Sequence, residues 1–311
     1  MSGIFPDKPL EGFAKAFLEG IPYARVAGMT ATAVSKARAS VSMKADAAWT
    51  GHASAEQIHP GVATVLADTA CGVAVGTAMD PVGPYATLDL RMDYLRPARA
   101  GSVLRCDAHC HRLSRSVAFV RGEVFQEGAD EPVAAVSATF MLATANTRRQ
   151  DLPPPPKDDA RTAGGPASPQ APWAGTPALP LGTSPYVEFL GIERMPAADG
   201  QEGDTFRMPF KPELIGNPVL PALHGGVVAG FAESAALLHL IYGNPHLAPH
   251  APRGVDFAID YLRSAKPIDT FARCTTVRQG SRVALVQVTV WQDDERKPIV
   301  SARCHCLLPQ G

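Results

Sequence analysis

Two acidic residues, Asp68 and Glu233, each stand alone in a long apolar stretch of the chain. Each follows a histidine by nine positions, since His59 precedes Asp68 (68 − 59 = 9) and His224 precedes Glu233 (233 − 224 = 9). A carboxylate held in apolar surroundings can act as a general base or as a nucleophile. These two acids are therefore the first candidates for catalytic residues.

Each histidine comes just before the expected start of a long helix, at Pro60-Gly61 in the first copy and Gly225-Gly226 in the second. An unpaired backbone N–H at a helix N-terminus can stabilise a developing oxyanion, helped by the helix dipole. Along one helix, nine residues separate the acid from its own histidine by about 13 Å. We therefore expect each acid to face the helix start of the other copy.

Pairing each acid with the helix start of the other copy gives two sites that differ in their residues. One combines Asp68 with Asn217, His224 and Gly225, and the other combines Glu233 with His52, His59 and Pro60. Gly225 has a backbone N–H, whereas Pro60 has none. Proline suits the first turn of a helix for structural reasons only. The sequence thus predicts an active Asp68 site and an impaired Glu233 site.

Further candidates for substrate contacts lie beside the motifs or in turns: Gly226, Thr69, His59, Arg96, Arg99, Arg263 and Lys266. The cationic side chains among them could meet phosphates, or they could be solvated turn charges. Thr69 and Ser234 directly follow the acids and could position water or simply pack within a helix. The acids and histidines also have a structural interpretation, as hydrogen-bond acceptors for backbone groups and as helix caps.

The motifs belong to a longer repeat. Pro22-Tyr23-x4-Gly28 returns as Pro185-Tyr186-x4-Gly191, and Asp93-Tyr94-Leu95-Arg96 returns unchanged as Asp260-Tyr261-Leu262-Arg263. The matches keep their order and a nearly constant offset, which indicates two homologous halves. The period is far longer than the roughly 20 to 50 residues of a solenoid repeat. We expect domains at 1–146 and 182–311, joined by a proline-rich linker at 147–181 that cannot bury enough apolar surface to fold.

Both halves have the same expected order of elements. A short helix (near 10–20 and 184–191) precedes a strand (near 29–43 and 203–211) and the long apolar helix (near 60–79 and 222–241). Four strands follow, near 85–95, 101–112, 116–127 and 132–143, and near 253–263, 268–279, 282–293 and 297–308. Consecutive strands after short turns pair antiparallel, so we expect α+β domains. A helix that is apolar on all sides is a buried helix, and here the sheet would wrap around it.

At these residues the chain resembles the acyl-CoA thioesterases of the PaaI type, which have the hotdog fold. The resemblance rests on Asn217-x6-His224-Gly225-Gly226, on Leu66-Ala67-Asp68-x-Ala70 and on the Asp-Tyr-Leu-Arg turn, and it covers roughly 20–143 and 184–308. It implies a tandem double hotdog with active sites between the two units. It also implies hydrolysis of an acyl-CoA to a free acid and CoA, an oxyanion donor at the residue after the motif histidine, no cofactor, and a homodimer of double-hotdog chains.

Two other functions stay open. Hotdog enoyl-CoA hydratases and dehydratases resemble this pattern, but in the dehydratases the acid follows a Pro-Gly by about five residues. Here Asp68 follows Gly61 by seven (68 − 61 = 7), and Glu233 follows Gly226 by seven (233 − 226 = 7), which favours a thioesterase. A non-catalytic acyl-CoA-binding protein would use the same fold.

The composition of the chain limits which kinds of partner it can be expected to bind. The net charge of −1 gives no reason to expect nucleic acid or an anionic membrane as a partner. The first residues lack the pattern of a signal peptide, so we expect a cytoplasmic protein whose six cysteines are reduced. Cys106-x3-Cys110 with its histidines, and Cys304-His305-Cys306, could suggest metal ligands, but strand neighbours point to opposite faces, and we expect no metal.

Overall fold

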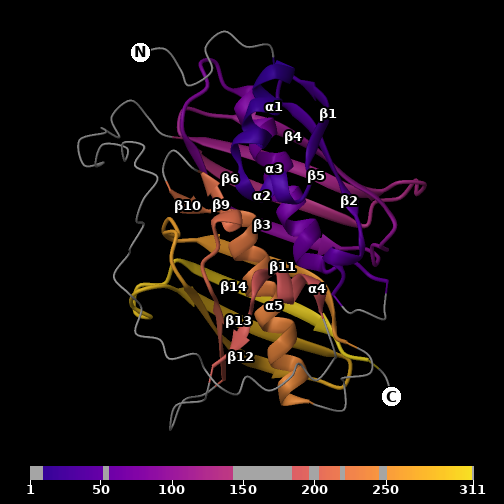
Figure 1. The fold of residues 1–311 in the computed structure, drawn as a ribbon, viewed down its shortest axis with the longest axis vertical. Coiled ribbons are helices and arrows are strands. Elements are labelled where there is room, and N and C mark those ends of the chain that lie inside the picture. The colour runs from indigo at the N-terminus through magenta and orange to yellow at the C-terminus, as the bar shows by residue number, and fades with distance from the viewer. Residues whose placement is uncertain are drawn as a thin grey trace.

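The computed structural model describes residues 10–51, 56–142, 184–195, 203–217, 221–244 and 251–309. The linker expected at 147–181 and the candidate His52 lie outside these ranges, so the expected domain boundaries stay a prediction. Within the described ranges the two halves of the chain form one body, with the first half at the top of Figure 1 and the second half below it.

The first half contains α1 (Leu10–Gly20), α2 (Pro22–Val26), β1 (Thr30–Ser35), β2 (Arg38–Ala45), a 3-10 turn (Ala47–Trp49), α3 (Pro60–Ala78), β3 (Tyr85–Tyr94), β4 (Ser102–Leu113), β5 (Val117–Gln126) and β6 (Ala134–Leu142). The single strand expected near 29–43 is wrong, because β1 and β2 form an antiparallel hairpin. The chain turns at Ala37, whose φ of 62° is in the left-handed region.

The second half contains α4 (Pro185–Leu190), β7 (Glu193–Arg194), β8 (Asp204–Met208), a 3-10 turn (Pro212–Leu214), β9 (Ile215–Asn217), β10 (Ala222–Leu223), α5 (Gly225–Gly243), β11 (Arg253–Tyr261), β12 (Thr270–Gln279), β13 (Val283–Trp291) and β14 (Val300–Leu307). The expected equivalence of helix 10–20 with helix 184–191 is wrong. The repeated Pro-Tyr begins both α2 and α4, so α4 corresponds to α2.

One antiparallel sheet of twelve strands runs through both halves, in the order β1-β2-β4-β5-β6-β3-β11-β14-β13-β12-β8-β7. The halves join where β3 pairs with β11. Asp93 pairs with Asp256, and Asp89 pairs with Asp260. Tyr94 and Tyr261 are equivalent (261 − 94 = 167), so Asp256 is the counterpart of Asp89 and Asp260 that of Asp93. The junction therefore has pseudo-two-fold symmetry, as in an isologous dimer interface.

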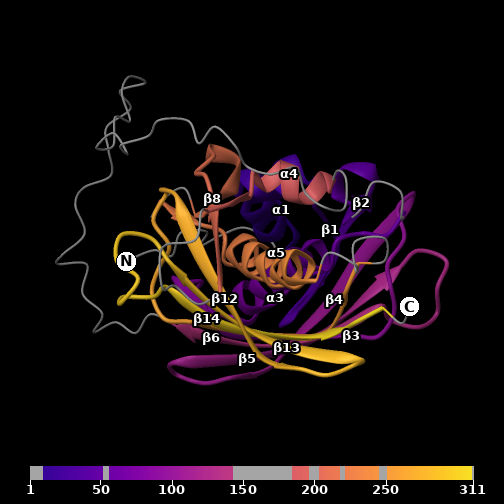
Figure 2. The ribbon, with the colours of Figure 1, turned by 90° about the horizontal axis from the view of Figure 1, so that it is seen from below.

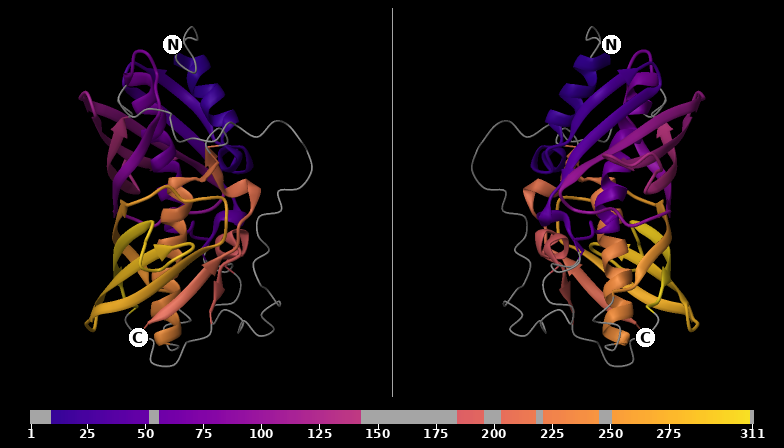
Figure 3. Two further views of the ribbon diagram at one scale, coloured as in Figure 1. Left: turned by 90° about the vertical axis from the view of Figure 1, so that its left-hand side faces the viewer. Right: turned by 90° about the vertical axis from the view of Figure 1, so that its right-hand side faces the viewer.

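The helices lie on one face of this curved sheet, as Figure 2 shows in a view along the molecule, with α3 and α5 innermost. Figure 3 shows the same two layers from the side. Eighteen of the nineteen residues of α3 are buried, from Gly61 to Ala78. Both long helices have the length and hydropathy of a membrane span, but the windows concerned are 94% and 83% buried inside the protein. The tandem α+β hotdog architecture expected from the sequence is confirmed.

Glycines allow α3 and α5 to approach closely near their N-termini. A Cβ on Gly61 would lie 2.9 Å from the Cα of Gly230, and a Cβ on Gly226 would lie 2.8 Å from the Cα of Val65. Gly61 and Gly226 are equivalent residues (226 − 61 = 165), so the helices contact each other symmetrically. This close contact brings the start of each helix beside the middle of the other.

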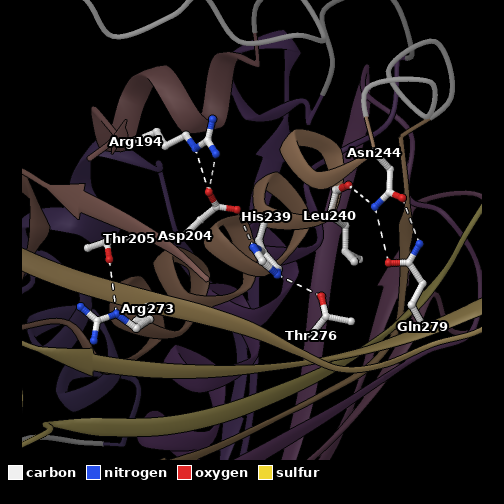
Figure 4. Close-up of polar contacts among 9 residues, drawn as sticks. All are labelled: Arg194, Asp204, Thr205, His239, Leu240, Asn244, Arg273, Thr276 and Gln279. Carbon is white, nitrogen blue, oxygen red and sulfur yellow. Dashed lines mark hydrogen bonds and ion pairs between the residues drawn. The ribbon is translucent and has the colours of Figure 1, made fainter. Parts of the chain in front are cut away.

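The far end of α5 is held to the sheet by a polar network (Figure 4). His239 Nδ1 lies 2.6 Å from Asp204 Oδ2 of β8, and His239 Nε2 lies 3.0 Å from Thr276 Oγ1 of β12. Arg194 of β7 donates to the other oxygen of Asp204. In α3 the equivalent of His239 is Ala74 (239 − 165 = 74), so the two halves anchor their helices differently.

Candidate active site

Asp68 of α3 lies against the N-terminus of α5. Its Oδ2 accepts a hydrogen bond from the Gly226 N–H at 2.7 Å, and its Oδ1 accepts one from Thr87 Oγ1 of β3 at 3.0 Å. The side chain is 6% exposed. Two donors from different elements thus fix the buried carboxylate at the junction between the halves.

His224 is the N-cap of α5 and is a neutral imidazole. Burial lowers its pKa, and the nearby Asp68 only partly opposes this effect. Its Nδ1 accepts from the Gly226 N–H at 3.0 Å, so the proton is on Nε2, which faces Thr69 Oγ1 at 3.2 Å. His224 Nδ1 and Asp68 Oδ2 are 3.5 Å apart, but they share the Gly226 N–H as acceptors and do not form an ion pair.

The backbone N–H of Gly225 has no hydrogen-bond acceptor among the described residues at this site. Gly225 is the first residue of α5, so its N–H has no acceptor within the helix. Among the described residues none accepts a hydrogen bond from it, while its carbonyl accepts from Tyr261 Oη at 2.8 Å. The position that a Gly225 Cβ would take is 3.2 Å from Asp68 Oδ2. Asp68 Oδ2 thus lies close to the residue whose N–H is unpaired.

Glu233 of α5 has a different environment. It is fully buried, and its Oε2 accepts from Tyr94 Oη at 2.8 Å and from Thr64 Oγ1 at 3.3 Å. Its Oε1 has no hydrogen-bond partner among the described residues. Burial raises the pKa of Glu233 to about 8, with the hydrogen bonds from Tyr94 and Thr64 opposing the shift. At neutral pH this side chain is therefore mostly a protonated acid.

The start of α3 repeats the cap of α5 without its open donor. His59 Nδ1 accepts from the Gly61 N–H at 3.0 Å, and His59 Nε2 lies 3.4 Å from Ser234 Oγ. Burial lowers the pKa of His59 to about 3, so it is neutral. The first helical residue is Pro60, which offers no N–H. This end of the interface thus has no equivalent of the Gly225 donor.

A cavity of about 810 Å³ opens beside the Glu233 site. Its wall comes from both halves and includes His59, Pro60, Tyr94, Ser234 and Gly254. This cavity and the unpaired N–H of Gly225 are therefore at opposite ends of the interface. A cavity shows where a ligand fits, whereas an oxyanion donor decides where a tetrahedral intermediate is stabilised.

Aromatic side chains of α1 pack over α3 in the first half. A Cβ on Gly76 would lie 2.2 Å from the Phe13 ring, and a Cβ on Gly72 would lie 3.6 Å from the Phe17 ring. Gly72 and Gly76 are equivalent to Leu237 and Ile241 (offset 165), which line the cavity. The space that is open beside α5 is thus occupied by phenylalanines beside α3.

The remaining predicted residues are more scattered. Asn217 is exposed at the end of β9, where it pairs with Ala222 of β10. Arg96 lies at the cavity and forms an ion pair with Glu131, and the backbone of Arg99 is bound by Gln126. The Arg263 side chain donates to the Pro298 carbonyl, and Lys266 pairs with Asp293 at 2.7 Å on the surface. The structure brings only Thr69, His224, Gly225 and Gly226 together with Asp68.

Several residues that contact the acids or the first peptide of α5 had not been predicted. Tyr94 and Tyr261 belong to the repeated Asp-Tyr-Leu-Arg motif, whose duplication was a usable signal for a role at the interface. Thr87 and Thr64 had no such signal, because neither belongs to a repeated motif. Only the fold places a residue nineteen positions after Asp68 next to it.

The cysteine and histidine clusters are divided between the faces of the sheet. Cys304 and Cys306 are buried with their sulfur atoms 3.3 Å apart, while His305 faces Asp256 at 3.0 Å. Within the described ranges, no group of three or more His, Cys, Asp or Glu side chains is arranged to hold a metal ion.

Comparison with known proteins gives one family match. Residues 57–133 and 220–299 match the family model of the thioesterase superfamily, one segment in each half. These segments together contain 157 residues (77 + 80), which is half of the 311-residue chain.

Two relatives are named as candidate esterases. A protein of Pseudomonas aeruginosa is 30% identical over 84 residues, and this match spans 61% of its length, or less than two thirds. A protein of Halobacterium salinarum is 42% identical over 105 residues, which span 68% of its length. Each match covers about a third of this chain or less (27% and 33%), so each relative corresponds to one unit of the repeat.

Solved structures resemble the whole chain. A candidate thioesterase from Novosphingobium aromaticivorans has a TM-score of 0.60 at 17% identity, covering 90% of this chain and 98% of its own. The acyl-CoA thioesterase II TesB2 from Mycobacterium marinum has a TM-score of 0.58 at 14% identity, covering 96% and 98%. At these identities the likeness concerns the fold alone.

Proposed function

The chain belongs to the thioesterase superfamily, and on that premise we propose that it hydrolyses acyl-CoA thioesters at a single composite site, formed by Asp68 and the N-terminus of α5. The observation that carries the proposal is the hydrogen bond of 2.7 Å from the Gly226 N–H to Asp68 Oδ2. It fixes a carboxylate of one half beside the open Gly225 N–H of the other half.

The reaction follows from this geometry. The thioester carbonyl oxygen accepts a hydrogen bond from the Gly225 N–H, and the dipole of α5 favours the negative charge that develops there. Asp68 supplies the nucleophile, either its own oxygen or that of a water molecule whose proton it removes. The C–S bond then breaks, and the thiolate of CoA leaves and takes up a proton. If water attacked, the acyl group leaves as a free acid; if Asp68 attacked, the acyl group is first held as an anhydride on Asp68, and a water molecule then cleaves it to the free acid and restores the carboxylate.

The groups around the two catalytic elements act as supports. Thr87 orients Asp68 through its second oxygen, and Tyr261 fixes the first peptide of α5 through the Gly225 carbonyl. Neutral His224, held by Thr69, caps the helix and leaves the Gly225 N–H free. We assign hydrolysis to this site although the large cavity lies at the other one, since the Glu233 site has Pro60 at the donor position.

Further parts of the proposal concern the substrate and its contacts, the assembly of the chain and its location in the cell. An acyl-CoA substrate is supported by the resemblance of the repeated motifs to those of PaaI-type acyl-CoA thioesterases, and the neighbour from Mycobacterium marinum is an acyl-CoA thioesterase. Assembly into a homodimer and a cytoplasmic location are expectations of the same kind. Asn217, Arg96, Arg99, Arg263 and Lys266 stay proposed substrate contacts, and of these Arg96 lines the cavity.

The proposal is tested by free-thiol release from a panel of acyl-CoAs of different chain length. We expect hydrolysis by the wild-type protein and loss of about 100-fold or more of kcat/KM in Asp68→Asn. Hydration of crotonyl-CoA serves as the comparison reaction. Hydration without thiol release would replace the proposal with a hydratase function.

A further inference from the structure

The cavity beside Glu233 has the composition of a small-molecule site. Its volume of about 810 Å³ is within the range of about 300–1,000 Å³ that is typical of ligand pockets. Many of the side chains that line it are aliphatic, among them Ala63, Val187, Leu237, Leu238 and Ile241. Such a lining fits an acyl chain.

The cavity also has unpaired positive charge. Arg253 and Arg282 line it, both are exposed, and neither forms an ion pair or a side-chain hydrogen bond with any described residue. Arg96 adds a third guanidinium, which is paired with Glu131. Guanidinium groups bind phosphates and carboxylates well. An apolar interior with free arginines thus matches a ligand that has an acyl chain and an anionic head.

The same end of the interface is poorly suited to hydrolysis. Pro60 offers no oxyanion donor, and burial keeps Glu233 mostly protonated at neutral pH, although the hydrogen bonds from Tyr94 and Thr64 oppose this effect. Even so, the frame of the site is kept, because His59 caps its helix as His224 does, and Tyr94-Leu95-Arg96 repeats Tyr261-Leu262-Arg263. The two ends of the interface therefore share the elements that would hold a thioester but not those that would cleave it.

We propose that the cavity formed by His59, Pro60, Leu238, Arg253 and Arg282 binds a second acyl-CoA without hydrolysing it. The acyl chain lies along Leu237, Leu238 and Ile241, and the phosphates of CoA meet Arg253 and Arg282 at the mouth. The identity of the ligand rests on the proposed function, whereas the existence of the site rests on the cavity. The chain thus has one hydrolytic and one binding site for the same molecule.

The test uses the full chain and S-dodecyl-CoA, a thioether that no thioesterase can cleave. Isothermal titration should give two equivalents bound per wild-type chain and one in the Arg253→Glu/Arg282→Glu variant. The affinity at the second site should fall at least about 10-fold, because hydrogen bonds to charged groups contribute a factor of that size. Arg278→Glu, a matched charge reversal on the exposed end of β12, should keep two equivalents.

A second variant fills the cavity. Ala63→Trp should also reduce binding to one equivalent, with its folding checked by thermal melting. One equivalent in the wild type, unchanged in both variants, would overturn the proposal. So would binding of dodecanoate in place of the thioether at this site, since the ligand would then be a free acid. Two equivalents of thioether without thiol release from any acyl-CoA would instead refute the proposed hydrolysis and leave this site standing.

Discussion

Thr87 and Gly254 occupy equivalent positions in β3 and β11, and each lies beside the acid of its own half. Thr87 Oγ1 donates to Asp68 Oδ1 at 3.0 Å. At Gly254 no side chain is present, and the position that its Cβ would take is 3.4 Å from Glu233 Oε1. The longer glutamate fills the space that the threonine occupies in the other half. It consequently has one carboxylate oxygen without a partner, whereas both oxygens of Asp68 are bound.

The two acids should contribute unequally to hydrolysis. Asp68→Asn keeps the size of the side chain but removes the base or nucleophile, so kcat/KM should fall by about 100-fold or more. Glu233→Gln should change kcat/KM by less than about threefold, since this acid is already mostly protonated at neutral pH. The comparison is made on the best acyl-CoA substrate, with folding checked by thermal melting. Equal losses would show that both sites work, and a larger loss for Glu233→Gln would reverse the assignment.

The Gly225 N–H can be removed directly. Gly225→Pro deletes the donor at a position where Pro60 shows that the helix accepts proline. Loss of one oxyanion donor costs about 2.7–4 kcal/mol, so kcat should fall by roughly 100- to 1,000-fold. Gly225→Ala is the control, because it keeps the N–H and adds a Cβ that would lie 3.2 Å from Asp68 Oδ2. If alanine and proline cost the same activity, crowding of Asp68 would explain the loss and the donor would not.

Burial of Glu233 should make stability depend on pH. Its pKa is raised from 4.5 to about 8 in the folded protein, so between these values the unfolded chain loses a proton that the folded chain keeps. The free energy of unfolding should therefore fall by up to about 1.4 kcal/mol per pH unit across this window and level off above it. The other titratable groups around Glu233 are Tyr94, Tyr186 and Cys304, whose raised pKa values keep them neutral there.

The matched variant for this effect is Glu233→Gln, an uncharged side chain of the same shape. Its stability relative to the wild type should increase steadily from pH 5 to pH 8, as measured by urea unfolding at several pH values. Parallel stability curves for the two proteins would mean that Glu233 keeps an ordinary pKa.

Assembly is a separate expectation. A tandem chain replaces one dimer of hotdog units, and the resemblance implies a further pairing of chains. Exposed apolar side chains on the strands, such as Phe119 of β5 and Val283 of β13, are 38% and 41% exposed and are available for it. Light scattering at micromolar concentration should give twice the chain mass of 32.8 kDa. A mass of one chain at that concentration would contradict the expectation.

Most of what the sequence predicted about the fold and the site came from the duplicated motifs. The repeat and the rise per residue of an α-helix were sufficient to predict Asp68 opposite the start of α5, because nine residues separate each acid from the start of its own helix by about 13 Å. The same reasoning left open whether the two sheets are joined or lie side by side, and the pairing of β3 with β11 shows that they are joined. The catalytic roles of these residues stay proposals.

Other features depended on contacts that no local pattern shows. The cavity exists because Leu237 and Ile241 stand where α3 has glycines covered by Phe13 and Phe17, which is a difference in packing between helices. The partner of Asp68, Thr87, comes from a strand whose alternation looks ordinary in the sequence. The hairpin at Ala37 was missed because a left-handed alanine gives no turn signal of the kind that glycine or asparagine gives.

The proposed difference in activity between the Asp68 site and the Glu233 site is tested most directly by restoring a backbone N–H donor at position 60. In an Asp68→Asn background, residual hydrolysis by the first site is small, so Pro60→Gly would reveal any activity of the second. A new N–H would then face a thioester in the cavity beside Glu233. Glu233 acts as a base only when ionised, and its pKa is about 8, so the gain should be small at pH 6 and should rise through pH 8.

The measurement is kcat/KM against pH for Asp68→Asn and for Asp68→Asn/Pro60→Gly. The double variant should exceed the single variant by at least about 10-fold at pH 9, with both proteins equally folded. Adding Glu233→Gln should abolish the gain, because the amide cannot accept a proton from water. A gain that is independent of pH, or that survives this third substitution, would show that Glu233 is not the base.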